Sequence, residues 1–67
     1  MLRVGQIYTN YNKIYAVTRV DDRAYIITND GRGSSRPCAD VHKMTLIAHY
    51  PTWQEAVCSK EFLGDKE

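Results

Sequence analysis

The feature of this sequence that most constrains its fold is a helix start close to the end of the chain. Thr52 and Glu55 stand three residues apart, the spacing at which an N-cap hydroxyl and a glutamate side chain bond to each other's backbone N–H groups. The spacing predicts a helix that begins at Thr52 and stops at Gly64, because glycine readily takes the left-handed backbone that closes helices. The residues before Thr52 have the character of short strands and turns.

Three segments before this helix are rich in the β-branched and aromatic side chains that favour strands. They span residues 4–8, 13–20 and 24–28. Between the first two, the asparagines at positions 10 and 12 tolerate the left-handed backbone of a tight turn. Asp21 and Asp22 mark a second turn, so the later two segments are predicted to pair as an antiparallel hairpin.

Residues 29–37 combine glycine, proline, serine and asparagine, and this composition predicts a long loop without regular structure. Residues 40–44 favour a single helical turn, and residues 45–50 a last strand that leads into the helix. The sequence therefore predicts an α+β fold in a single small globular domain, 1–67. It consists of a small curved antiparallel β-sheet of three to five strands and one C-terminal α-helix.

The alternation of side chains along the second predicted strand leaves open which of its faces is buried. In the favoured register Tyr15 and Val17 point inward. Tyr25 and Ile27 then join them and give the core enough bulk for a tightly curved sheet. In the other register Tyr8, Tyr15 and Tyr25 form an exposed aromatic platform of the kind on which nucleic-acid bases stack.

A chain of 67 residues forms a thin core, because a domain of this size buries only about 60% of the surface that its unfolded chain exposes. A catalytic cavity would remove packing that such a domain needs, so we expect no enzymatic activity and recognition at the surface. The formal net charge of +1 lacks the basic excess typical of proteins held mainly by phosphates. Composition thus favours a protein partner over nucleic acid.

Cys38 and Cys58 are too few for a disulfide framework and are expected to be free thiols. With His42 and His49 they are possible zinc ligands, but their spacing matches no compact ligand pair followed by a second pair. We expect no metal and no cofactor. No apolar run approaches the length of about 18 residues that a membrane-spanning helix requires, so we expect a cytoplasmic protein without membrane contact.

Two parts of the chain resemble known families. Residues 4–8, followed by the hairpin of residues 13–28, resemble the start of SH3-like small barrels, many of which bind partners without catalysis. Residues 50–57, with Phe62 beyond them, are similar to the C-terminal part of short uncharacterised phage and prophage proteins of Gram-positive bacteria. This second resemblance implies a role in modulating a host protein. The proline-peptide groove pattern of signalling SH3 domains is missing, so recognition of that kind is not implied.

We therefore expect a non-enzymatic protein-binding module whose partner is a host or phage protein. Its expected contacts are exposed aromatic and arginine side chains, which often supply interface energy. They are Tyr11, Arg32, Arg36 and Phe62. For Phe62 the alternative is a last helical turn that folds back onto the domain. A further possible partner is a second copy of the chain, joined as a homodimer through an unpaired sheet edge or Phe62.

The chief alternative function is that of a nucleic-acid-binding SH3-like small barrel. Its contacts would be cationic side chains that neutralise phosphates. They are Arg19, Arg23, Arg32, Arg36 and Lys43. Residues 31–36 also have a superficial similarity to a phosphate-binding loop, but they lack the Gly-Lys-Ser/Thr ending, so a flexible inter-strand loop is favoured there.

Overall fold

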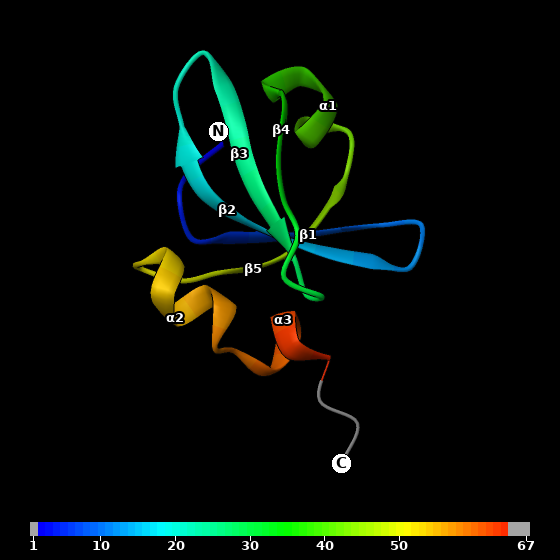
Figure 1. Ribbon diagram of the computed structural model, residues 1–67, viewed down its shortest axis with the longest axis vertical. Helices are drawn as coiled ribbons and strands as arrows, with labels where there is room; N and C mark the ends of the chain where they lie inside the picture. The colour runs from blue at the N-terminus through cyan, green and yellow to red at the C-terminus, as the bar shows by residue number, and fades with distance from the viewer. Residues whose placement is uncertain (1, 65–67) are drawn as a thin grey trace.

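The computed structural model describes residues 2–64. Within this range five strands form one antiparallel sheet, in the order β4-β3-β2-β1-β5, and three short helices complete the fold (Figure 1). The elements in chain order are β1 (Gln6–Asn10), β2 (Lys13–Val20), β3 (Arg23–Thr28), β4 (Gly33–Pro37), α1 (Cys38–His42), β5 (Thr45–His49), α2 (Trp53–Val57) and α3 (Lys60–Leu63). The predicted α+β class and the antiparallel sheet are confirmed.

Two-residue turns connect the first three strands. β1 and β2 are joined by Tyr11 and Asn12, whose positive φ values of 52° and 66° are those that a tight hairpin turn requires. The predicted turn is confirmed, although Asn10 belongs to β1 and the left-handed pair includes the tyrosine. Asp21 and Asp22 join β2 to β3, so the predicted hairpin is also present.

The segment predicted to be an irregular loop contains a strand instead. Gly31, with a φ of 94°, closes a short turn in which the Thr28 amide donates to the Arg32 carbonyl at 2.8 Å. The Gly31 amide donates to the Thr28 carbonyl at 2.9 Å, and the chain then runs back along β3 as β4. The prediction was wrong because only the first part of the segment turns, and an edge strand accepts the proline that a central strand excludes.

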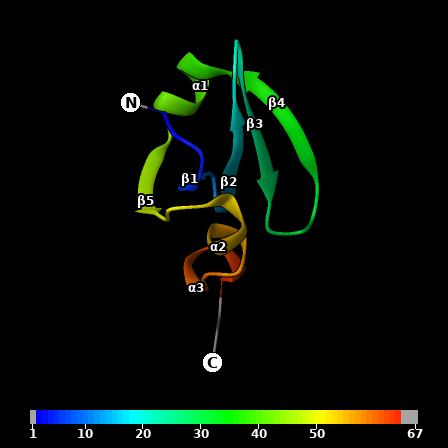
Figure 2. The ribbon, with the colours of Figure 1, turned by 90° about the vertical axis from the view of Figure 1, so that its left-hand side faces the viewer.

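The predicted N-cap of the C-terminal helix is confirmed. The Thr52 hydroxyl accepts a hydrogen bond from the Glu55 amide at 3.2 Å, and α2 begins at the next residue after Thr52. α2 and α3 lie at the opposite end of the molecule from α1 (Figure 2). One end of the sheet is therefore covered by α1 and the other by α2 and α3.

Two short helices stand in place of the single predicted one. The Ser59 hydroxyl donates to the Ala56 carbonyl at 2.6 Å and accepts from the Phe62 amide at 3.2 Å. It therefore competes with the backbone bonds that would continue α2 and caps α3 instead. Gly64 ends α3 in the left-handed conformation, with a φ of 64°, as predicted.

The two faces of the sheet carry separate hydrophobic clusters. We call the face on which Tyr15 and Val17 are buried the inner face, and their burial agrees with the favoured register. The cluster on the inner face consists of Leu2, Tyr8, Tyr15, Val17, Ala24, Ile26 and Val41. Because Tyr8 and Tyr15 are buried here, the exposed aromatic platform of the other register does not form.

The opposite side of the sheet is the outer face, and α2 and α3 cover part of it. Its buried cluster consists of Ile7, Ala16, Ala56 and Phe62. Ile27 packs against this cluster, and Tyr25 is 38% exposed, so neither joins the inner core as predicted. The reason is the register: Val17 pairs with Ile26, and residues directly opposite share a face.

Candidate functional site

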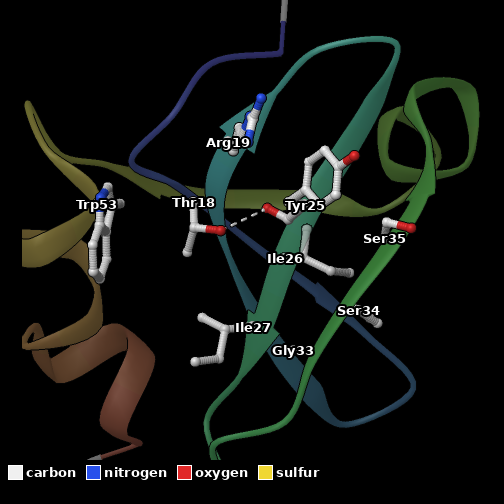
Figure 3. Close-up of a pocket in the computed structure, with 9 residues that line it drawn as sticks. All are labelled: Thr18, Arg19, Tyr25, Ile26, Ile27, Gly33, Ser34, Ser35 and Trp53. Carbon is white, nitrogen blue, oxygen red and sulfur yellow. Dashed lines mark hydrogen bonds between the residues drawn. The ribbon is translucent and has the colours of Figure 1, made fainter.

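A shallow apolar groove of about 700 Å³ lies on the outer face, between the strands and α2 (Figure 3). We call it the outer groove. It is lined by Thr18, Arg19, Tyr25, Ile26, Ile27, Gly33, Ser34, Ser35 and Trp53. Its surface is almost entirely apolar. A surface of this kind suits apolar side chains of a partner better than a polar ligand.

The outer groove exists because of the register between β3 and β4. Tyr25 and Ile27 alternate onto the outer face. Their cross-strand partners in β4, Ser35 and Gly33, are small and leave open space beside them. Trp53, from the first turn of α2, forms the facing wall, and Figure 3 shows its ring across from the strands.

A β-bulge positions the polar rim of the outer groove. The β2–β3 register shifts between Val17 and Arg19, and the Thr18 hydroxyl donates to the Tyr25 carbonyl at 3.2 Å (Figure 3). The shift places Arg19 opposite Tyr25, with its guanidinium carbon 5.5 Å from the ring centroid, a cation–π distance. Arg19 Nη2 also lies 2.7 Å from Asp21 Oδ2. Both charged side chains are at least half exposed, so this ion pair adds little stability.

A second, polar surface lies on the side of the inner face. It consists of two hollows of about 380 and 320 Å³ that share Arg36. It includes the exposed Tyr11 and six charged side chains, which are Lys13, Asp30, Arg32, Arg36, Asp40 and Lys43. We call it the basic surface, because four cations face two carboxylates among its described residues. It brings together three predicted protein contacts, Tyr11, Arg32 and Arg36, and the two arginines with Lys43 are also three of the five alternative nucleic-acid contacts.

Hydrogen bonds keep Asp30 ionised within the basic surface. The Thr28 hydroxyl donates to its carboxylate, the Arg32 amide donates at 3.2 Å, and the Arg32 and Lys13 charges are nearby. These interactions hold the pKa of Asp30 below its ordinary value of 3.8. Arg32 Nε lies 3.9 Å from the carboxylate and its side chain is 87% exposed, so Arg32 remains accessible to a ligand.

Three of the predicted contacts lie away from the basic surface. Phe62 is only 5% exposed and packs in the outer cluster, so the predicted partner contact is corrected to a core residue. The alternative in which the last turn folds back onto the domain is therefore the observed one. Arg19 and Arg23 lie near the outer groove, so the five predicted nucleic-acid contacts are divided between the two faces of the sheet.

Trp53 was not among the predicted contacts, and Tyr25 was expected to be exposed only in the register that the structure does not adopt. Their positions at the outer groove depend on the register of the sheet and on how far α2 extends over it. The available signal was the small size of Gly33 and Ser35, since small residues on an edge strand leave their neighbours uncovered. The prediction of a loop over this segment concealed that signal.

Among residues 2–64, no three His, Cys, Asp or Glu side chains gather into a possible metal site, and the Cys38 and Cys58 thiols are free. No helix in the same range has the length and apolar character needed to cross a bilayer. Comparison of the chain with protein-family models, curated proteins and solved structures finds no match. The function therefore has to be inferred from the outer groove and the basic surface themselves.

Proposed function

We propose that this chain is a non-enzymatic SH3-like small barrel of phage or prophage type, which binds a host or phage protein in the cytoplasm through the outer groove. The observation that carries the proposal is the gathering of Tyr25, Ile27 and Trp53 around one apolar hollow, with Arg19 at its rim. Tyrosine, tryptophan and arginine are the residues that most often supply binding energy at protein interfaces. The phage-type origin is supported by the resemblance of residues 50–57 alone.

The strand order supports the barrel. α1 joins the edge strands β4 and β5, and its Val41 packs against the inner face, as expected of a sheet that curls around its own side chains. Tyr8, Tyr15 and Val17 occupy that interior. A packed interior favours recognition on the outside, which supports a binding role without catalysis.

Trp53 provides a direct test of groove binding, because it is the single tryptophan of the chain and lines the outer groove. Displayed random peptides are selected on the immobilised chain, and the selected peptides are synthesised with a fluorescent label. We expect apolar peptides whose binding shifts the tryptophan emission to shorter wavelength. Anisotropy titrations should show an affinity loss of about tenfold or more in a Trp53→Ala variant, as for a residue at the centre of an interface.

Leu63 offers a matched control for this experiment. It is another exposed apolar side chain, 58% accessible, and it does not line the outer groove. The Leu63→Ala variant should bind the selected peptides with unchanged affinity. Equal losses in the two variants, or a selection in which no peptide distinguishes Trp53→Ala from the unmodified chain, would refute the outer groove as the binding site.

A second candidate function, binding of single-stranded nucleic acid, is favoured by one observation on the basic surface. Tyr11 is 87% exposed, and its φ of 52° is unusual for a bulky side chain. Strained backbone of this kind is found preferentially at functional sites. The tyrosine shares a hollow with Arg36 and Lys43, an arrangement that suits base stacking beside phosphates.

Titration of a fluorescent oligothymidylate at two salt concentrations tests this second candidate. If it holds, affinity falls steeply with salt, and both Tyr11→Ala and Arg36→Gln weaken binding several-fold. Arg19→Gln is the matched control, since it removes the same charge from the outer face. Equal effects of the two arginine substitutions, or no binding at low salt, would reject the candidate.

A further inference from the structure

The free edge of β4 presents backbone hydrogen-bonding groups beside the outer groove. Thr28 and Arg32 form a hydrogen-bonded pair where the β3–β4 ladder begins, with the Thr28 amide 2.8 Å from the Arg32 carbonyl. Such pairs alternate along an antiparallel ladder, so every second residue of β4 bonds to β3. Gly33 and Ser35 are the residues between, and they turn their N–H and C=O groups toward the open edge. Pro37, which has no N–H, occupies the next outward position, as expected of a strand edge.

The side chains of β4 leave room for a strand added at this edge to reach the outer groove. On the outer face, Gly33 stands opposite Ile27. Ser35 likewise stands opposite Tyr25. Because neighbouring strands lie about 4.8 Å apart, a side chain of an added strand has only a glycine or a serine between itself and these groove residues. Apolar residues at alternate positions of that strand would therefore enter the outer groove.

Among residues 2–64, the charged side chains at this edge that lack an acidic partner are positive. Arg23 stands opposite Pro37, and it donates from Nε to Ser35 Oγ at 3.2 Å and from Nη2 to the Ser35 carbonyl at 3.3 Å. Both bonds are long and exposed, so they exchange readily for a charged partner. Arg19, the charged residue among the described lining of the groove, is already paired with Asp21. Charge complementarity therefore places a carboxylate of the ligand at Arg23.

We propose, on the basis of the proposed function, that the outer groove binds an extended segment of a partner protein that adds antiparallel to β4. From its N-terminus, the segment has an acidic residue opposite Pro37, an apolar residue opposite Ser35 and a second apolar residue opposite Gly33, with one residue between each. Arg23 turns from the Ser35 carbonyl to the acidic side chain, and that carbonyl then accepts an N–H of the segment. The backbone bonds set direction and register, while the groove selects the side chains.

The test uses a labelled synthetic peptide with aspartate, valine and isoleucine at alternate positions, in that order, and serine or threonine elsewhere. Two variants are compared at a position whose N–H faces the open edge rather than β3. Ser35→Pro removes this N–H, whereas Ser35→Ala keeps it. Anisotropy titrations should show an affinity loss of about tenfold or more for Ser35→Pro and a change below about threefold for Ser35→Ala.

Modified peptides test the same contact without altering the protein, which keeps the test valid if proline disturbs β4. N-methylation of the isoleucine blocks an N–H directed at β4, whereas N-methylation of the residue before it blocks one directed away. Only the first modification should abolish binding. Equal loss with both, or no loss with either, would overturn strand addition.

The contact between the peptide's aspartate and Arg23 is tested by changing each partner separately and both together. Asparagine in place of the peptide's aspartate should weaken binding several-fold in the unmodified chain and have little effect in an Arg23→Gln variant. The same loss in both proteins would exclude Arg23 as the partner of the carboxylate and overturn the proposed register.

The outcomes separate this inference from the proposed function. Binding that requires Trp53 but is unaffected by Ser35→Pro and by N-methylation would overturn strand addition and leave groove binding intact. Failure of all peptides, including those selected by display, would reject both. Self-association in sedimentation experiments that Ser35→Pro abolishes would assign the edge to a second copy of the chain and overturn the partner segment.

Discussion

The two faces of the sheet bury their apolar side chains in different ways. The inner face is filled by large residues of the strands themselves, among them Tyr8, Tyr15 and Ile26, and α1 completes it. Among the described residues of the outer face, only Ile7 and Ala16 are buried strand residues, and their cluster depends on Phe62, which α3 brings from the C-terminal part of the chain. Because this cover does not reach Tyr25, the outer groove stays open. The comparison shows that strand residues and α1 fill the inner face, whereas the cover of the outer face is incomplete and leaves open the groove in which we propose that a partner binds.

The two edges of the sheet differ in a related way. β4 has a regular register and small residues facing the outer groove, so an added strand finds a continuous ladder. In β5 the register shifts opposite Ile7 and Tyr8, which leaves Ile47 unmatched. Leu46 and Ile47 are about half exposed, but the bulge interrupts the ladder that a second strand would need. The regular edge, rather than the more apolar one, is therefore the better docking edge.

The largest expected effect comes from removing the cover of the outer face. Phe62→Ala should destabilise the domain by about 3–5 kcal/mol, because it leaves a cavity over Ile7 and Ala16. Total stability for a domain of this length is on the order of 3–10 kcal/mol, so Phe62→Leu provides a milder variant. Leu63→Ala, at an exposed neighbour, should cost below about 0.5 kcal/mol. Urea denaturation measures the free energy of unfolding of all three variants. Equal losses of stability for Phe62→Ala and Leu63→Ala would show that the outer face does not depend on burial of Phe62.

A substitution at Gly5 tests how firmly the segment that leads into α2 and α3 is attached to the sheet. Its amide donates to the Val17 carbonyl and its carbonyl accepts from the Tyr50 amide, both at 2.9 Å, so it ties the sheet to the segment that enters α2. A Cβ at Gly5 would lie 2.2 Å from the Tyr50 carbonyl oxygen, and its φ of 94° is strained for other residues. Gly5→Ala should therefore cost about 2–4 kcal/mol in urea denaturation.

Gly31 isolates the contribution of the clash at Gly5. It has the same φ of 94°, but a Cβ there would meet no atom within 4 Å. Gly31→Ala should cost only the conformational strain, about 1–2 kcal/mol. Similar costs at the two glycines would mean that the segment entering α2 moves aside easily and does not anchor the cover.

Tyr11 tests whether the basic surface, on the side of the inner face, also serves recognition. Its left-handed backbone favours asparagine over tyrosine, so Tyr11→Asn should stabilise the domain by about 0.5–1 kcal/mol. Asn12→Ala, at the other left-handed position, should destabilise the domain by a similar amount. Thermal unfolding measures both. If Tyr11→Asn also weakens oligothymidylate binding, the tyrosine is retained for binding at a cost in stability. If Tyr11→Asn destabilises the domain instead, the turn is not strained.

The parts of the fold that local chemistry determines could be predicted from the sequence. The Thr52 cap, the bounds of β2 and the turn at Asp21 and Asp22 follow from neighbouring residues, and the structure confirms them. Ser59 shows the limit of such signals. A serine within a helical segment can face solvent or interrupt the helix, and here it bonds to Ala56 and ends α2.

The candidate sites were less predictable because they depend on tertiary register. The sequence identified Tyr11, Arg32 and Arg36 by type, and the basic surface brings them together. The bulge at Thr18 and the small residues of β4 decide that Tyr25 borders a groove, and neither has a signature within a short window of sequence. The register of strand pairing is what separates a core tyrosine from one that borders a groove.

The smallest expected effect concerns the bond that holds α3 over the outer face. The Tyr50 hydroxyl donates to the Glu61 carboxylate, which lowers the pKa of Glu61 below its ordinary value of 4.5 and raises the pKa of Tyr50 above 10.0. The lowered carboxyl pKa contributes stability that is present above pH 4.5 and is lost as pH falls through the folded value. The raised phenol pKa contributes stability that is present below pH 10.0 and is lost as pH rises through the folded value.

Tyr50→Phe should therefore lower the melting temperature slightly at neutral pH, and the difference from the unmodified chain should shrink in acid and in alkali. Melting curves from pH 3 to pH 11 measure this difference. Tyr11→Phe, which removes the hydroxyl of an exposed ring, should leave the profile unchanged. A difference for Tyr50→Phe that is constant across the whole range would mean that the loss comes from packing of the ring against the outer cluster. In that case packing of Phe62 and the Tyr50 ring, rather than the Tyr50–Glu61 hydrogen bond, holds α3 over the sheet.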